Sequence, residues 1–419
     1  MSDQLTAEIR QNVAQSLAQK LREEYVFPET GEKFAAQIQA RLTQGAYDAI
    51  TDAHVFAQTL VADLYEVAID LHLTVQYDPA WAERLAQPKP EGDAAPDFLR
   101  LVALRENNYG FRKVEQLAGN IGYIDLRMFI PSEYGGETAV AAMNWVANTD
   151  ALIFDLRQNR GGNPSMIQLI TSYLFPPEPK HLNSFYVRRA NTSQQFWTLP
   201  HVPGRRMPDV PVYVLTSGRT GSAAEEFTYN LKNMRRATIV GETTIGAAHP
   251  TDFRAVGAGF VLGLPYGRAV NPITETNWEG VGVEPDIAVP AEDALKTAHL
   301  HALERLIAAS PDEERTRRLQ WDWQTAQSAY NPVLVDETIL FRYVGEYGNR
   351  EFRLENGAPV LKLKTHGTRY KLTPLTETLF AMDEGARIQL ISEDGQMATT
   401  KMIVRYRDNP QETVIPRTE

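Results

Sequence analysis

The sequence contains no cysteine among its 419 residues. Disulfide bonds, thiolate metal sites and a cysteine nucleophile are therefore excluded. No apolar run approaches the roughly 18 residues that a membrane span needs, so no spanning segment is expected. The N-terminus, MSDQLTAEIRQ, lacks the apolar core of a signal peptide. As written, the chain is expected in the cytoplasm, whereas removal of a signal peptide would make it periplasmic or secreted.

Basic residues are outnumbered by acidic ones. Lys and Arg total 42 against 53 Asp and Glu, which gives a net charge of −11. Binding to nucleic acid needs clustered basic side chains, so we expect no nucleic-acid partner. The apolar content of 43% and the charged content of 23% are ordinary for a soluble globular protein. A chain of 419 residues is too long for one core, so two or three domains are expected.

The first part of the chain shows helical periodicity. Apolar residues at four-residue spacing predict two helices, with a break at residues 28–31, and a third helix runs from about residue 54 to 65. The residues that carry the first two are Ile9, Val13, Leu17 and Leu21, then Phe34, Ile38 and Leu42. We predict an N-terminal helical domain over residues 1–80.

The middle of the chain alternates between short apolar runs and amphipathic helices. Strands are predicted at residues 120–126, 151–156, 212–215 and 237–240. Helical patterns lie between several of them, around residues 167–174 and 224–231. Buried strands that alternate with amphipathic helices indicate a layered α/β core, here predicted over residues 81–309.

Two further helices are predicted over residues 292–308 and 311–328, the second with a Ser310 cap and Pro311 in its first turn. Residues 310–334 are interpreted as a helical linker. From about residue 335 the period changes to alternation, with Asn-Gly and Asp-Gly hairpin turns at Asn356 and Asp394. We predict a C-terminal antiparallel β domain over residues 335–419, which could bind a partner or substrate.

Ser222 stands where a predicted strand turns into a helix, in VLTSGRTGSAAEEF. The first backbone N–H groups of a helix have no helical partners, so they can bind an oxyanion, and the helix dipole favours negative charge there. Ser222 and Glu225 also form the pattern of a capping box, which is a structural device. The pattern alone leaves both interpretations open.

A second turn, DLRQNRGGNP, places Gly161 and Gly162 between a predicted strand and a helix. Paired glycines let a backbone approach a ligand closely and leave N–H groups exposed. This turn is either half of an oxyanion hole or a plain connection.

A serine nucleophile needs a base within hydrogen-bonding reach and a group that orients the base. His72 lies in an apolar, strand-like segment, with Asp70 two residues away on the same face of that strand. His249 follows another glycine turn and is the rival base. Glu279 lies in the turn-rich stretch NWEGVGVEPDI, where acids are usually solvated.

The ordered segments DLRQNRGG, VLTSGRTGSAAEEF, RATIVGETTIG and GVGVEPDI resemble those of the tail-specific (C-terminal processing) proteases, over residues 120–290. NYGFRKVE and GNIGYIDLR resemble the branch related to interphotoreceptor retinoid-binding protein, and the interval between His72 and Asn120 leaves no room for the usual PDZ insert. The resemblance implies an α/β fold with a crotonase-like (ClpP-type) spiral core.

Alignment of GETTIG with the family's GE-x-T-F-G-K places the nucleophile on Ser222 and the family's catalytic lysine on Ala247. A methyl group cannot accept a proton, so the resemblance implies that the Ser-Lys pair is absent. Lys232 lies ten residues along the helix from Ser222, roughly 15 Å away at 1.5 Å per residue. It is therefore not expected to replace the missing base.

The tricorn protease branch uses Ser, His and Glu instead, and the resemblance places these roles on Ser222, His72 and Glu279. Tricorn's serine before its histidine is replaced here by Leu71. The oxyanion hole would consist of the N–H groups of Ala223 and of Gly161 or Gly162. We expect a serine peptidase that acts on a peptide or protein and needs no metal or organic cofactor. The alternative is a carrier without turnover for apolar, retinoid-like or lipid-like ligands.

Overall fold

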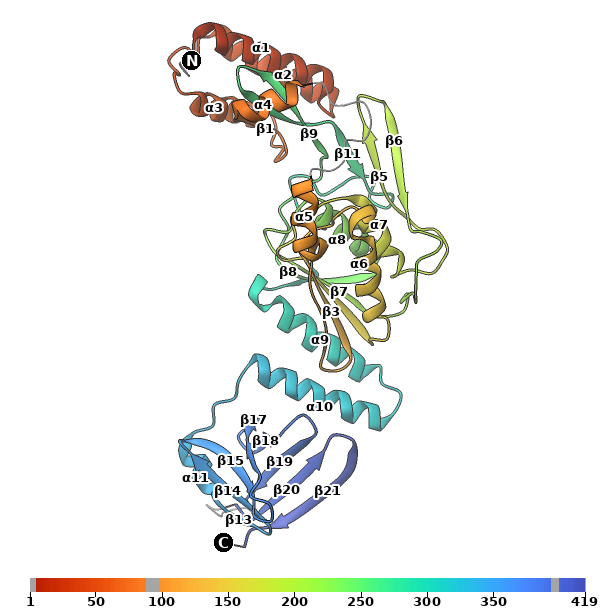
Figure 1. Ribbon diagram of the computed structural model, residues 1–419, viewed down its shortest axis with the longest axis vertical. Coiled ribbons are helices and arrows are strands. Elements are labelled where there is room, and N and C mark those ends of the chain that lie inside the picture. The colour runs from red at the N-terminus through yellow and green to blue at the C-terminus, as the bar shows by residue number, and fades with distance from the viewer. Residues whose placement is uncertain (1–4, 88–97, 393–398, 419) are drawn as a thin grey trace. The chain divides into compact units, whose positions relative to one another are not determined.

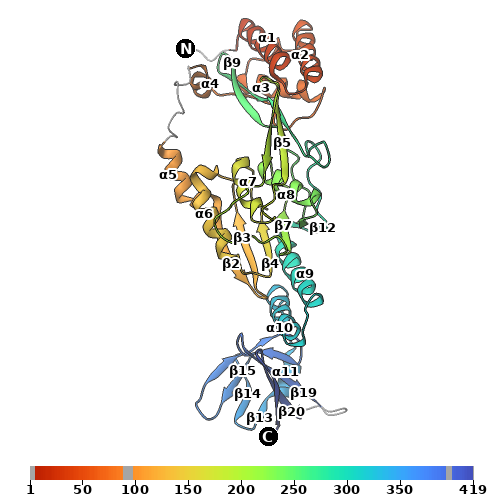
Figure 2. The same cartoon turned by 90° about the vertical axis from the view of Figure 1, so that its right-hand side faces the viewer.

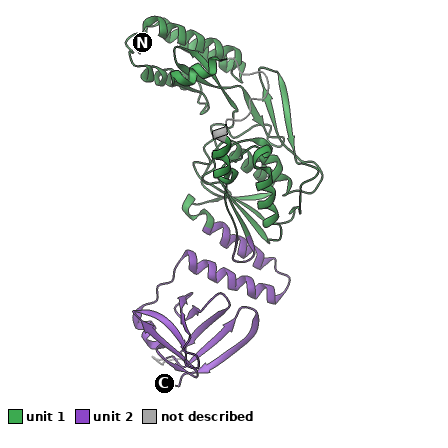
Figure 3. Ribbon diagram, viewed as in Figure 1, with its two compact units in different colours: residues 1–115, 122–295 green, residues 116–121, 296–419 purple. Residues whose placement is uncertain are grey.

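The computed structural model describes residues 5–87, 98–392 and 399–418. The chain forms two compact units, coloured separately in Figure 3. The first comprises residues 1–115 and 122–295, and the second comprises residues 116–121 and 296–419. Among the described residues, no helix combines the length and the apolar character that crossing a membrane would require.

The chain begins with α1 (Ala7–Glu24) and α2 (Pro28–Thr43), which pack side by side (Figures 1 and 2). Helix α3 (Ala53–Tyr65) contacts α2, α4 (Pro79–Ala86) contacts β9 (Thr251–Gly257), and α5 (Phe98–Glu106) follows further along the chain. The predicted break at residues 28–31 is wrong, because Pro28 begins α2 and Gly31 lies within that helix. Proline suits the first turn, where its missing N–H would have no helical partner anyway.

Helices α1–α3 share one apolar core with an antiparallel sheet of order β1-β10-β9. The strands are β1 (Thr74–Tyr77), β10 (Phe260–Pro265) and β9 (Thr251–Gly257). Because β1 pairs with β10, the segment predicted as a separate domain over residues 1–80 lies in the same compact unit as the α/β core. Distant pairing of this kind leaves no mark in local periodicity.

The central sheet has the strand order β12-β8-β7-β4-β3-β2. Its strands are β2 (Phe111–Leu117), β3 (Ile121–Leu126), β4 (Ala151–Asp155), β7 (Val212–Thr216), β8 (Ala237–Gly241) and β12 (Ile287–Ala288). The four predicted strands are thereby confirmed. Figure 2 shows β3, β4 and β7 side by side.

Strands β4, β7 and β8 pair in parallel, so their carboxyl ends meet at one edge of the sheet. The turn with Gly161 follows β4, and the turn with Ser222 follows β7, the next strand across. Helices α6 (Ser132–Trp145), α7 (Pro164–Ser172) and α8 (Ala223–Asn233) supply side chains to the core, where the Phe227 ring contacts those of Phe129 and Phe154. The topology therefore brings both predicted turns together.

A third sheet, of order β11-β5-β6, forms a long hairpin beside this core. It consists of β5 (His181–Val187), β6 (Thr192–Trp197) and β11 (Gly267–Val270). Short 3-10 turns lie at Asn108–Gly110 and Ala291–Asp293.

The second unit contains α9 (Ala294–Ala308), α10 (Glu313–Tyr330), α11 (Glu337–Tyr343) and two antiparallel sheets. One sheet is β13 (Gly345–Tyr347), β14 (Arg350–Glu355), β15 (Ala358–Leu363) and β16 (Arg369–Lys371). The other is β17 (Thr373–Pro374), β18 (Leu379–Ala381), β19 (Ala386–Ile391), β20 (Lys401–Tyr406) and β21 (Asn409–Pro416).

The predicted turn at Asn356 joins β14 to β15, whereas the predicted turn at Asp394 lies outside the described residues. Helix α10 is capped by Asp312, not by Ser310. The Asp312 carboxylate accepts from the Arg315 N–H at 2.7 Å.

Candidate active site

Ser222 occupies an unusual backbone conformation between β7 and α8. Its φ is 55° and its ψ is −122°, although it carries a side chain. Positive φ is costly for a residue other than glycine, and such strain persists only where the surroundings impose it. The Ser222 N–H donates to Oε2 of Glu225 at 2.7 Å, so the glutamate half of the predicted capping box is formed.

Glu225 is fully buried and holds this turn in place. Its Oε1 accepts from Oγ1 of Thr244 and from the Gly246 N–H, both at 2.6 Å. Its Oε2 accepts from the Ala247 N–H at 2.9 Å as well as from Ser222. Burial raises the pKa of Glu225, and these hydrogen bonds oppose the rise. The carboxylate therefore ties Ser222 to the segment that carries Gly246 and Ala247.

The glycine turn after β4 lies directly against the nucleophile. A Cβ on Gly161 would stand 2.7 Å from Cβ of Ser222, and the Gly161 φ of +112° also favours glycine. The Gly161 N–H is already bound to Oδ1 of Asn159 at 2.8 Å. Of the two predicted glycine donors, Gly162 is therefore the one left available.

Gly162 and Phe129 form a parallel β-bridge. Its two hydrogen bonds run from the Phe129 N–H to the Gly161 carbonyl and from the Asn163 N–H to the Phe129 carbonyl. The N–H of Gly162 itself takes no part in the bridge. Within the described part of the chain, the N–H groups of Gly162 and Ala223 have no hydrogen-bond partner. Ala223 is the first residue of α8, where an unpaired N–H is expected. Two unpaired amides thus flank Ser222.

His72 lies in a turn just before β1, and the prediction that it sits on a strand is wrong. Asp70 does not share a strand face with it. Instead, Oδ1 of Asp70 accepts from the backbone N–H of His72 at 3.0 Å, which is a turn-forming contact. The carboxylate therefore fixes the backbone of His72 and leaves its ring to other partners.

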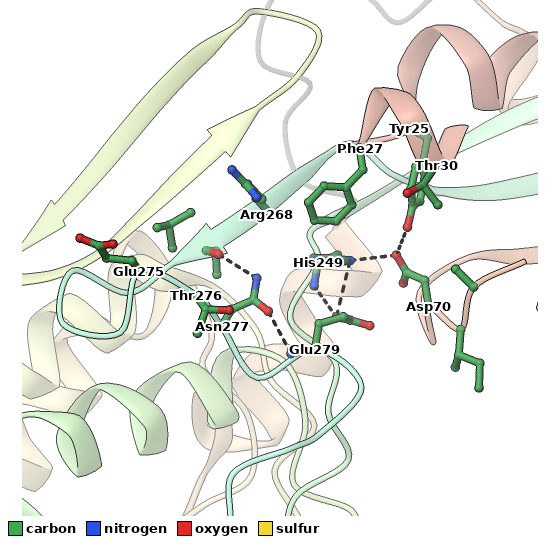
Figure 4. A pocket seen from close by; sticks show the side chains of 14 residues that line it. Tyr25, Phe27, Thr30, Asp70, His249, Arg268, Glu275, Thr276, Asn277 and Glu279 are labelled. Carbon is green, nitrogen blue, oxygen red and sulfur yellow. Dashed lines mark hydrogen bonds and ion pairs between the residues drawn. The ribbon is translucent and has the colours of Figure 1, made fainter. Parts of the chain in front are cut away.

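Asp70 orients His249. Its Oδ2 lies 2.8 Å from Nδ1 of His249 and accepts from the Tyr25 hydroxyl at 2.9 Å (Figure 4). Burial alone would raise the pKa of Asp70, but the bond to His249 and that ring's charge outweigh it, so the pKa is lowered. Burial and the neighbouring Asp70 raise the pKa of Tyr25. Asp70 is therefore an ionised, buried partner of one imidazole.

Glu279 lies between the two imidazoles. Its Oε2 accepts from the N–H groups of Ala248 at 2.5 Å and His249 at 3.1 Å. The same oxygen lies 3.7 Å from Nδ1 of His249 and 3.8 Å from Nδ1 of His72. Among the described residues, neither Nδ1 of His72 nor Oε1 of Glu279 has a hydrogen-bond partner, although both atoms are buried. A small movement would bring His72 and Glu279 into direct contact.

The donor atoms of Asp70, His249 and Glu279 lie within 4.8 Å of one another, close enough for one metal ion to contact all three. Oδ2 of Asp70 already accepts from Tyr25 and lies 2.8 Å from Nδ1 of His249, so this oxygen has protein partners.

One cavity joins the predicted residues. It has a volume of about 640 Å³ and is lined by Ser222, His72 and His249 together with Gly162 and Ala223. A second cavity of about 310 Å³ is lined by Asp70, His249 and Glu279, which Figure 4 shows with the His249 ring pointing toward both acids. The two cavities share His249. The structure thus gathers the predicted nucleophile, both histidines and the amide pair around one space.

Lys232 points elsewhere. Its Nζ binds the carbonyl of Glu284 and lies 3.4 Å from Oδ1 of Asp286. Lys232 lies in the last turn of α8, whereas Ser222 precedes the first, in agreement with the predicted distance between them.

Neither the role of Tyr25 nor the pairing of Asp70 with His249 was predicted from the sequence. These residues come from three separate segments that only the fold brings together. The signal that could have pointed to them is chemical: both candidate histidines needed an acid, and Asp70 stood beside one of them in the sequence.

Comparison with known proteins gives a consistent result. Residues 120–289 match peptidase family S41, and residues 4–110 match the N-terminal domain of peptidase S41 in eukaryotic IRBP. A carboxy-terminal-processing protease of Bartonella bacilliformis is 28% identical over 179 residues, which are 42% of this chain and 40% of that protein. A carboxyl-terminal-processing protease of Synechocystis is 31% identical over 129 residues, 30% of this chain and 28% of the relative.

The chain thus matches less than half of the length of either relative. Among solved structures, mature CPAF superposes with a TM-score of 0.50 at 13% identity, covering 73% of this chain and 99% of that one, which shows a shared mixed α/β fold. The two matched regions lie on either side of residue 115 and contain every residue of the site described above. This chain therefore belongs to peptidase family S41, with an N-terminal domain of the IRBP type.

Proposed function

We propose that this protein is a serine peptidase in which Ser222 is the nucleophile. The observation that carries the proposal is the strained conformation of Ser222 at the start of α8, in one cavity with two imidazoles and two unpaired amides. Structural strain concentrates at functional sites, and a plain helix cap does not need it. The carboxy-terminal-processing proteases that match the chain support a peptide or protein substrate.

In the proposed reaction, Oγ of Ser222 attacks the peptide carbonyl while His72 takes the hydroxyl proton. The N–H groups of Ala223 and Gly162 stabilise the negative oxygen of the tetrahedral intermediate. His72 then protonates the leaving amine, an acyl-enzyme forms, and water completes hydrolysis. Glu279 orients His72 and stabilises its charged form after a closure of less than 1 Å from the 3.8 Å separation.

A second assignment gives the role of base to His249, with Asp70 as its orienting acid. It is supported by the 2.8 Å contact between them, which is a full hydrogen bond, whereas His72 and Glu279 are not yet within bonding distance. Both histidines line the cavity of Ser222. The two assignments share the nucleophile and the amides.

We further propose that the core is the crotonase-like spiral that the sequence resemblance implies.

The alternative function is an apolar-ligand carrier on the same scaffold, for which the aromatic side chains Phe185, Phe196 and Trp278 in the cavity wall provide a surface.

The proposal is tested by hydrolysis of peptides and of an activated ester by Ser222→Ala, His72→Ala and His249→Ala. Ser222→Ala should lower turnover by about 10⁴-fold or more, and one histidine variant should approach that loss. Whichever histidine gives the larger loss is the base. Unchanged turnover in Ser222→Ala would refute the nucleophile, and co-purified lipid without any turnover would favour the carrier.

A further inference from the structure

Glu226 is an acid in the wall of the nucleophile's cavity. It lies on α8 three residues after Ala223, so these two side chains lie on the same side of that helix, and both line the cavity with Ser222. It is only 2% exposed, yet it lines the cavity. The side chain is therefore shielded from bulk water, and it stands in the wall of the space that Ser222 also lines.

The surroundings of Glu226 leave its charge uncompensated. Asn183 on β5 is the one side chain shown to interact with it in the described part of the chain, and that amide nitrogen does not reach full hydrogen-bonding geometry. No Lys or Arg is among the described residues that line the cavity. Burial raises the pKa of Glu226 to about 8. A buried carboxyl group without a cationic partner lowers the free energy of unfolding, and a purely structural role does not explain why the fold places one here.

One part of the wall is aromatic and aliphatic, and it lies in the same cavity as polar residues such as Asn163, Gln194 and Thr251. Phe185 and Val187 follow Asn183 at alternate positions of β5, so the strand turns these three side chains to one face. Phe196, Tyr266 and Trp278 complete this surface. This surface, next to one acid, suits a side chain with a long aliphatic part and a cationic end group. The apolar side chains would cover the aliphatic part, and the aromatic faces would attract the cation.

We propose that Glu226 marks a subsite for a lysine or arginine side chain of the substrate, at the residue whose carbonyl Ser222 attacks. This rests on the proposed peptidase function. From Ala223, the residue after the nucleophile, to Glu226 the helix rises about 4.5 Å, which is within the reach of a lysine side chain from its own backbone. An apolar side chain of equal length would bury the carboxyl group further without giving it a partner. A bound cation favours the ionised form, so Glu226 releases its proton to solvent and its carboxylate accepts a charge-assisted hydrogen bond.

The test compares two peptides that differ only at this residue, lysine against norleucine, which has the same stem without the charge. Wild-type protein should cleave the lysine peptide with a kcat/KM at least ~10-fold higher, the selectivity expected for one hydrogen bond to a charged group. Glu226→Gln should abolish the preference by slowing the lysine peptide and sparing the norleucine peptide. Glu178→Gln removes the same charge from an exposed position and should keep the preference.

Equal or faster cleavage of the norleucine peptide by wild-type protein would overturn the proposal, even if Glu226→Gln does not fold. Binding of both peptides to Ser222→Ala, measured by calorimetry, does not depend on catalysis. If no variant or wild-type preparation turns over any peptide, the peptidase function fails. In that case, tenfold tighter binding of the lysine peptide than of the norleucine peptide to Ser222→Ala would still support the subsite. Equal binding of the two peptides would refute it.

Discussion

Replacing Glu225 with glutamine perturbs the support of the nucleophile while changing the side chain's shape very little. Each carboxylate oxygen accepts two hydrogen bonds, one pair from Thr244 and Gly246 and the other from Ala247 and Ser222. The glutamine NH₂ group donates and cannot accept, so one pair faces a donor. Three of the four partners are backbone N–H groups, which cannot reverse their role.

Hydrogen bonds to charged groups contribute about 1.5–3 kcal/mol each, so losing one pair should destabilise the fold by about 3–6 kcal/mol. If the Thr244 hydroxyl turns to accept, the loss is roughly half of that value. For the first compact unit, a loss of about 3–6 kcal/mol in the free energy of unfolding lowers Tm by about 5–15 °C. Peptide turnover should fall as well, because the segment that holds Ser222 moves.

Thermal unfolding followed by circular dichroism measures this effect, with Glu178→Gln as a control for the loss of one exposed negative charge. A Glu225→Gln protein with wild-type Tm and wild-type turnover would refute the reasoning, because two buried donors would then have tolerated the loss of their acceptor.

Three further results are expected. Gly161→Ala should lower kcat/KM for peptides by about 10²-fold, because the new Cβ would stand 2.7 Å from that of Ser222; full activity would contradict the close packing. The pKa of Glu226 is raised to about 8 from 4.5, so the folded state holds the extra proton between these values and wild-type stability falls as pH rises through that window. The Tm of Glu226→Gln relative to wild type should therefore rise from pH 5 to 8, and a constant difference would count against the raised pKa. Asp70→Asn should lower Tm by a few degrees, through loss of about 1–3 kcal/mol from its buried contacts with Tyr25 and His249, and an unchanged Tm would be inconsistent with that network.

Much of the fold could be predicted from local patterns. The strands β3, β4 and β7 are buried along their length and β8 over its last three residues, and their apolar runs stand out in the sequence for that reason. The cap of α10 was misplaced by two residues, since Ser310 and Asp312 are both good caps and only the backbone path distinguishes them.

Contacts between distant segments could not be predicted in this way. The apolar residues around His72 predict a strand there. In the structure, the Asp70 carboxylate accepts from the His72 N–H in a turn, and β1 begins only at Thr74. Asp70 binds a histidine far along the chain, and no local spacing encodes that partner. Ser222 was predictable because one short segment carries both the turn and the helix start.

The most direct test of the central claim is covalent labelling with an alkyl fluorophosphonate, followed by peptide mapping with mass spectrometry. A hydroxyl activated by a neighbouring base reacts with this reagent, whereas ordinary serines do not. We predict one adduct, on Ser222, which is lost in Ser222→Ala. An adduct on another serine, or continued peptide hydrolysis without any adduct on Ser222, would contradict the account.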